Sequence, residues 1–121
     1  MTVSEPLVQS ILLGDAVEHA PVGILVADEE MRYVATNAYA CELLGYTREE
    51  LLRLKITDVA RDPKVPDQFA EVQAHGRLDG TARISRKDGV ELAVHYRAAE
   101  TTIADLTYYV AVIWPAASPR P

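Results

Sequence analysis

Residues 20–52 decide the fold of this chain, and they read APVGILVADEEMRYVATNAYACELLGYTREELL. Two short apolar runs, residues 22–27 and 31–35, flank the turn residues Asp28, Glu29 and Glu30. Short apolar runs on either side of a polar turn are typical of a β-hairpin. We therefore expect two antiparallel strands at the start of the fold.

Helix-capping residues follow this hairpin directly. Asn37 is a favourable N-cap for a helix over residues 38–44, and Gly45 is suited to end it. Thr47, with Glu50 three residues later, has the form of a capping box and predicts a second short helix. Further short helices are expected over residues 56–60 and 67–75.

Before the hairpin, residues 4–20 are predicted to form a helix that Ser4 caps and Pro21 ends. After the short helices, three strands are expected over residues 78–86, 90–99 and 106–114. In the second of these strands, alternate residues from Val90 to Ala98 are predicted to be buried. The fold class is therefore α+β, with one antiparallel five-stranded sheet, short helices on one face and an N-terminal helix outside.

Composition excludes several classes of function. Twelve Lys and Arg stand against 18 Asp and Glu, and the net charge of −6 opposes non-specific binding to nucleic acid or to an anionic membrane. One cysteine rules out an intramolecular disulfide. The sequence contains no signal-peptide core and no span of about 20 apolar residues, so we expect a cytoplasmic protein. No nucleophile elbow, phosphate loop or metal-ligand pair is present, so neither an enzyme nor a metal site is expected.

In their order and spacing, the segments 20–28, 33–37 and 37–46 and the later hairpin 83–89 resemble a PAS domain, the small sensory module of bacterial signalling proteins. The resemblance covers residues 16–114. It implies a pocket between the sheet and the short helices, which in different members holds haem, flavin, a carboxylic acid, a lipid or nothing. The chain departs from the family after Trp114, where Pro115 replaces the start of the usual Asp-Ile-Thr ending. We expect a flanking helix over residues 1–20, a PAS core over 21–114 and a Pro-rich tail over 115–121.

The resemblance argues against two of the family's cofactors, and the ligand itself stays unknown. Flavin photosensors carry a reactive cysteine at a position that falls near Ile56 here. Haem-binding members use a histidine on the helix near Asp67, where this chain has Gln68, and His75 comes only two turns later. The arginine that assists oxygen sensing would fall near Gly80. Neither a flavin photoadduct nor haem is therefore expected.

The resemblance also places the pocket walls. The predicted ligand-binding residues are Ile56, Phe69 and Val72 from the helices and Ala82, Ile84, Val94, Tyr96, Tyr109 and Ala111 from the strands. The two tyrosine hydroxyls, with Thr57 or Gln68, are candidate polar contacts. Such a lining suits a small, mostly apolar molecule with one polar group. In the alternative interpretation, these side chains simply fill the core.

Two functions therefore remain open. The first is a sensor whose ligand alters contacts with a signalling partner at the outer face of the sheet, and the second is a ligand-free interaction or dimerisation module. The last strand places apolar side chains outward, and the N-terminal helix carries a matching stripe. We predict a homodimer through these residues, which are Tyr108, Val110, Val112, Trp114, Leu7, Val8, Ile11 and Leu12. In the alternative, the helix folds back on its own sheet.

Overall fold

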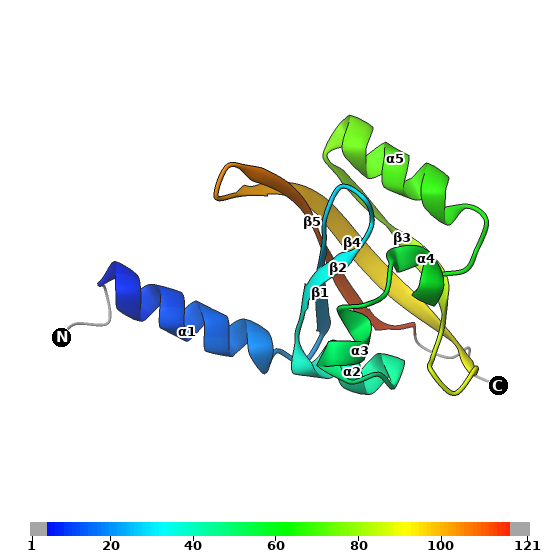
Figure 1. Cartoon of the computed structure of the whole chain (residues 1–121), viewed down its shortest axis with the longest axis horizontal. Coiled ribbons are helices and arrows are strands. Elements are labelled where there is room, and N and C mark those ends of the chain that lie inside the picture. Colours follow the sequence, from blue (N-terminus) through cyan, green and yellow to red (C-terminus); the bar gives the residue numbers. More distant parts are fainter. Residues whose placement is uncertain (1–4, 117–121) are drawn as a thin grey trace.

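The computed structural model describes residues 5–116 and confirms the predicted α+β fold. Helices and strands follow one another in the expected order (Figure 1). The elements are α1 (Pro6–Glu18), β1 (Gly23–Ala27), β2 (Tyr33–Thr36), α2 (Ala38–Leu44), α3 (Arg48–Leu51), α4 (Ile56–Val59), α5 (Val65–His75), β3 (Arg77–Ser85), β4 (Glu91–Ile103) and β5 (Leu106–Pro115).

The five strands form one antiparallel sheet in the order β2-β1-β5-β4-β3. The first and last strands of the chain are therefore neighbours near the middle of the sheet, where Leu25 lies opposite Ala111. Helices α2 to α5 lie on one side of the sheet (Figure 1). The core lies between these layers, with Leu44 and Leu51 from the helices and Leu25 and Val94 from the strands all buried.

The predicted helix caps are present and explain where the short helices begin and end. The Asn37 side chain accepts a hydrogen bond from the Ala40 amide over 3.1 Å at the start of α2. Gly45 ends α2 in the left-handed conformation, with φ of 79°. Thr47 and Glu50 form both hydrogen bonds of the capping box at α3.

The structure corrects the predicted limits of β4. This strand continues to Ile103, and Val90 lies just outside it and is 56% exposed, so the burial predicted for Val90 is wrong. The extension pairs with β5 as far as Ile103 and Leu106. Ala104 and Asp105 join the strands, and both have a positive φ, as tight hairpin turns require. Because neither residue is glycine, the sequence carries no strong turn signal there.

Two prolines also lie inside elements rather than in the loops predicted for them. Helix α5 begins at Val65, and Pro66 lies in its first turn, where proline has no hydrogen bond to lose. Pro115 is the last residue of β5, and the Ala116 amide beyond it donates to the Ala93 carbonyl over 2.9 Å. Successive backbone amides along a strand point to opposite sides, so the nitrogen of Pro115 faces β1. The pairing with β1 ends at Ile113, and no ladder bond is lost there.

Helix α1 extends away from the rest of the protein (Figure 1) and has no buried residue. The alternative in which this helix covers its own sheet is therefore wrong. The base of α1 is held by the Asn37 side-chain amide, which donates to the Val17 carbonyl over 2.8 Å. The predicted cap Ser4, and residues 117–121 of the predicted tail, lie outside the described residues.

Candidate ligand-binding cavity

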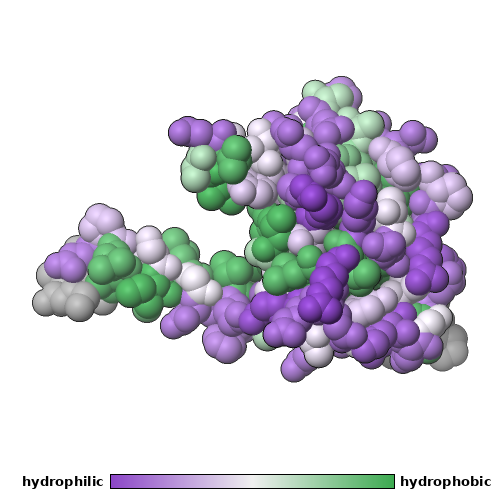
Figure 2. All heavy atoms as spheres, in the orientation of Figure 1, coloured by the Kyte–Doolittle hydropathy of each residue, from purple (hydrophilic) through white to green (hydrophobic). Residues whose placement is uncertain are grey.

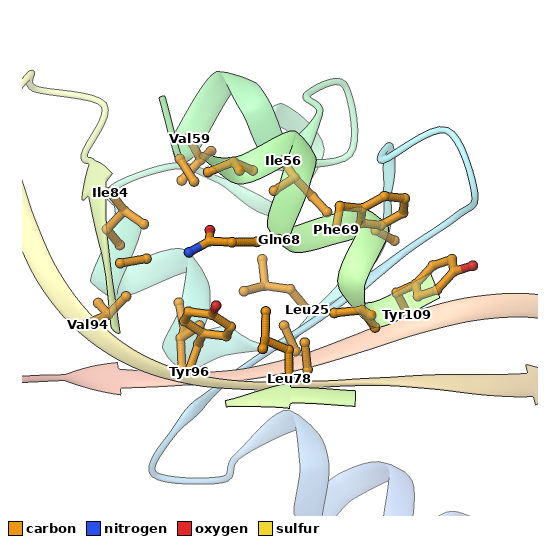
Figure 3. Close-up of a pocket in the computed structure, with 18 of the residues that line it drawn as sticks. Leu25, Ile56, Val59, Gln68, Phe69, Leu78, Ile84, Val94, Tyr96 and Tyr109 are labelled. Atoms are coloured by element: carbon orange, nitrogen blue, oxygen red, sulfur yellow. The ribbon is translucent and has the colours of Figure 1, made fainter. Parts of the chain in front are cut away.

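A cavity of about 130 Å³ lies between the sheet and helices α4 and α5, and it is partly open to solvent. Its walls come from both layers (Figure 3), and they are almost entirely apolar. On one side, the Phe69 ring packs against the Tyr109 ring, with 4.7 Å between their centroids. Large side chains therefore surround the cavity without filling it.

All nine residues predicted to bind a ligand lie on the wall of this cavity. Ile56 on α4 and Phe69 and Val72 on α5 form the helical side. The strand residues form the other side, and they are Ala82, Ile84, Val94, Tyr96, Tyr109 and Ala111. Because the strands alternate as expected, these side chains share one face of the sheet. Their role in ligand binding stays a prediction.

The candidate polar contacts divide into two groups. The side chains of Gln68 and Tyr96 reach into the cavity from opposite walls (Figure 3). The hydroxyl of Tyr109 points away from the cavity, although its ring lines the wall (Figure 3). Thr57 is exposed on α4 and does not line the cavity. Only one of the two tyrosine hydroxyls therefore faces the space.

Burial raises the pKa of two tyrosines in the cavity wall. Burial raises the pKa of Tyr33 far above its usual value, and nearby Asp58 raises it further. Burial also raises the pKa of Tyr96, with smaller contributions from the negative charges of Glu71 and Asp79. A tyrosine hydroxyl is already uncharged at neutral pH and these shifts keep both groups in that form, so the Tyr96 hydroxyl can donate a hydrogen bond.

Several wall residues were missed from the sequence. Leu25 and Ala27 on β1, Leu78 on β3 and Ala98 on β4 also line the cavity. Ala98 belongs to the alternation predicted for β4, and β1 shows the same pattern, because Gly23, Leu25 and Ala27 are buried. The alternating pattern of these two strands could therefore have indicated Leu25, Ala27 and Ala98 as wall residues. The pairing of β1 with β5, which brings Leu25 opposite Ala111, was not predicted from the sequence.

The residues predicted to form a dimer interface lie on β5 and on α1, and one of them, Val110, also lines the cavity. Tyr108, Val110, Val112 and Trp114 are half-buried, and Trp114 lies beside His95 with 5.6 Å between ring centroids. On α1, Leu7 is 71% exposed and Ile11 is 56% exposed. Leu12 is also exposed, and Val8 is half-buried. Figure 2 shows apolar side chains gathered along α1 and, across an open notch, on the hairpin that joins β4 to β5.

Two further features are absent from residues 5–116. Within residues 5–116, no three His, Cys, Asp or Glu side chains are grouped so that they could hold a metal ion. In the same range, every helix is too short or too polar to cross a membrane.

The fold and the cavity between its two layers define a class of protein. A family model described as PAS fold matches residues 14–111. This chain belongs to the PAS family, whose members are sensory modules of signalling proteins and are generally non-catalytic. No curated protein sequence is similar enough to count as a match.

Solved structures support the same fold. A PAS domain from a two-component sensor histidine kinase superposes with a TM-score of 0.83 at 13% identity, covering 93% of this chain and 100% of the other. A domain of a sensor histidine kinase/response regulator from Geobacter sulfurreducens gives 0.78 at 23% identity, covering 93% and 98%. The PAS domain of a LuxR-family transcriptional regulator from Burkholderia thailandensis, in complex with ethanol, gives 0.69 at 16% identity, covering 84% and 95%.

Proposed function

We propose that this chain is a non-catalytic, cytoplasmic sensor that binds a small, mostly apolar ligand in the cavity between its sheet and its helices. The observation that carries the proposal is the cavity itself, which has apolar walls and two polar side chains that reach into it. Sites for small molecules are commonly concave and apolar with few polar groups. That another PAS domain is known in complex with ethanol agrees with a small ligand.

A ligand screen by thermal shift tests this proposal. A compound present at about 100 times its dissociation constant stabilises the folded state by ~2.7 kcal/mol, which raises the melting temperature by several degrees. Two neighbouring alanines on β4 supply matched variants, because Ala98 lines the cavity and Ala99 is exposed. Ala98→Leu should abolish the shift for any compound found, and Ala99→Leu should preserve it. A screen without binders, with Ala98→Leu only raising stability, would support the ligand-free alternative.

Signal output is proposed to pass through a homodimer that forms on α1 and the outer face of the sheet. An isolated helix of 13 residues is only marginally stable in water. Yet α1 exposes Leu7, Ile11, Leu12 and Leu13, and burial of each such side chain contributes about 1.5–3 kcal/mol. A second copy can cover both surfaces in one self-complementary contact, since each chain offers a helix and a sheet face.

A groove beside α1 supports the proposed contact on the sheet. A groove runs between the last turn of α1 and the outer side of β1 and β2, lined by Val17, Ile24, Val26 and Ala35. Ile24 and Val26 lie opposite Val112 and Val110 of β5, so the groove continues into the predicted interface. This continuity of apolar surface favours a second copy over a polar partner.

Sedimentation tests the dimer with two variants of the same helix and the same added charge. Leu12→Glu places a carboxylate among the apolar residues, whereas Ser10→Glu places one at an exposed polar position. We expect a dimer for the wild type and for Ser10→Glu, and a monomer for Leu12→Glu and for the double variant Leu12→Glu, Val110→Glu. A wild type that stays monomeric at high micromolar concentration would overturn this part of the proposal.

A further inference from the structure

Gln68 and Tyr96 are polar side chains that reach into the otherwise apolar cavity, where both remain partly accessible. Gln68 enters from α5 and Tyr96 from β4 (Figure 3). Within residues 5–116, neither side chain forms a hydrogen bond with another protein group. The Gln68 amide and the Tyr96 hydroxyl can each donate and accept. Both therefore keep their full hydrogen-bonding capacity for a molecule inside the cavity.

Gln68 lies on the face of α5 that carries the buried residues of this helix. Val65 and Val72 are the buried residues of the helix, and Gln68 lies three residues after the first and four before the second. Residues at these spacings share one face of a helix. Gln68 thus occupies the inward face, where an apolar residue would pack without loss of hydration. An amide at that place brings a hydrogen-bonding group to a largely apolar wall.

The cavity offers no charge that could balance an ionised ligand. None of the residues that line it is Asp, Glu, Lys, Arg or His. The nearest electrostatic influence on the Tyr96 hydroxyl is negative, from Glu71 and Asp79. A carboxylate or phosphate in this space would lose part of its hydration without gaining a counter-ion, which is unfavourable.

Size restricts the ligand further. The volume of about 130 Å³ is similar to that of an apolar protein cavity of about 150 Å³ that takes up benzene. A single ring or a short carbon chain fits a space of this size. The two polar side chains then serve one polar end of the molecule, while the apolar walls contact the remainder.

We propose that the cavity selects a compact, uncharged organic molecule with one hydrogen-bonding oxygen, such as an alcohol, phenol, ketone or amide, and that the Gln68 amide and the Tyr96 hydroxyl bind that oxygen. Carboxylic acids of the same carbon skeleton are ionised at neutral pH and are excluded. This inference rests on the proposed function, because it assumes that the cavity binds a ligand.

Four probes in two matched pairs test the inference by protein-observed NMR titration at pH 7. Phenol and toluene differ in a hydroxyl, and benzamide and benzoate differ in charge. We expect phenol to bind about 3- to 10-fold more tightly than toluene, as one net hydrogen bond supplies. We expect benzamide to bind at least about 10-fold more tightly than benzoate.

Three variants test which side chains form a hydrogen bond with the hydroxyl group of phenol. Gln68→Leu and Tyr96→Phe should each reduce the affinity for phenol about 3- to 10-fold and leave toluene unchanged or slightly tighter. Tyr109→Phe removes a hydroxyl that points away from the cavity, so it should change neither affinity. Toluene binding also confirms that each variant keeps a folded cavity.

The outcomes separate this inference from the proposed function. Toluene and phenol binding with equal affinity, or benzoate binding as tightly as benzamide, would overturn the inference while the cavity remained a binding site. Loss of phenol affinity in Tyr109→Phe alone would overturn the assigned contacts. Failure of all four probes to bind the wild type would overturn the proposed function and this inference together.

Discussion

Arg48 at the start of α3 forms an ion pair with Glu18 at the end of α1, with 2.5 Å between Nη2 and Oε1. The same guanidinium donates from Nε to the Thr36 carbonyl over 3.1 Å. One side chain therefore joins the projecting helix to β2 and to the helical layer that covers the cavity. Thirty residues separate the two partners in sequence.

Removing this pair should loosen α1 more than it destabilises the protein. Exposed ion pairs contribute about 0.2–1 kcal/mol, so Arg48→Ala should lower the free energy of unfolding by about 1 kcal/mol or less. The direction of α1 should vary more, which lowers the NMR order parameters at its last turn. Glu18→Gln should have the same effect, and the double variant should add little. Unchanged order parameters in both single variants would show that the pair does not hold the helix.

Asn37 should be the least replaceable polar residue of the fold. Its side-chain oxygen accepts from the amides of Ile24 and Ala40, and its nitrogen donates to the carbonyls of Val17 and Val22, over 2.8–3.1 Å. Asn37→Ala leaves several of these backbone groups without partners and should destabilise the fold by about 3–5 kcal/mol in urea unfolding. Asn37→Asp keeps the acceptor but places a buried carboxylate oxygen against the carbonyls of Val17 and Val22, so it should be at least as damaging at neutral pH. A loss of only about 1 kcal/mol for alanine would mean that water replaces these bonds.

Gly23 should not tolerate a side chain, because β1 lies very close to β5 and α2 at this residue. A Cβ atom there would lie 2.7 Å from Cγ1 of Ile113 and 3.4 Å from Cα of Ala40. Gly23→Ala should therefore lower stability by about 1–3 kcal/mol, as overpacking does. Gly14 on α1 has open space, so Gly14→Ala should not destabilise and should favour the helix. Equal melting temperatures for both variants would contradict this account.

Glu50 should make the stability depend on pH in the acid range. The hydrogen bond from the Lys87 side chain, followed by that from the Thr47 amide, lowers the pKa of this carboxyl from 4.5 to about 2. The carboxylate therefore stabilises the folded state above pH 4.5, and this contribution is lost as the pH falls toward 2. The stability difference between wild type and Glu50→Gln should shrink between pH 5 and pH 3 in urea unfolding.

The neighbouring carboxyl provides a control for this pH dependence. Glu49 is exposed, and it forms no ion pair within residues 5–116. Glu49→Gln removes a charge from the same turn of α3 and leaves the Glu50–Lys87 contact in place, so a pH effect that belongs to that contact should be absent from this variant. A constant difference for Glu50→Gln as well would show that the contact with Lys87 has no effect on folding.

Residues close together in sequence made much of this protein predictable. Asn37, Gly45 and the pair Thr47 and Glu50 set the limits of α2 and α3, because capping acts within one turn of helix. The alternation in β4 placed Val94 and Tyr96 on one face, because side chains alternate along any strand. These local rules were sufficient to predict the fold class, whereas the nine residues of the cavity wall were predicted from the resemblance to a PAS domain.

Tertiary structure alone decided how those pieces meet. The pairing of β1 with β5 brought Leu25 to the cavity, and packing placed Gln68 opposite Tyr96 and turned the Tyr109 hydroxyl outward. The direction of α1 depends on Asn37 and Arg48, which lie far along the chain from their partners. Apolar patterning specifies that a surface must be covered but not which surface covers it, since hydrophobic burial is non-directional. The sequence by itself therefore determined the elements and the faces they bury, whereas the packed structure determined which side chains share the cavity and left the apolar residues of α1 without burial among residues 5–116.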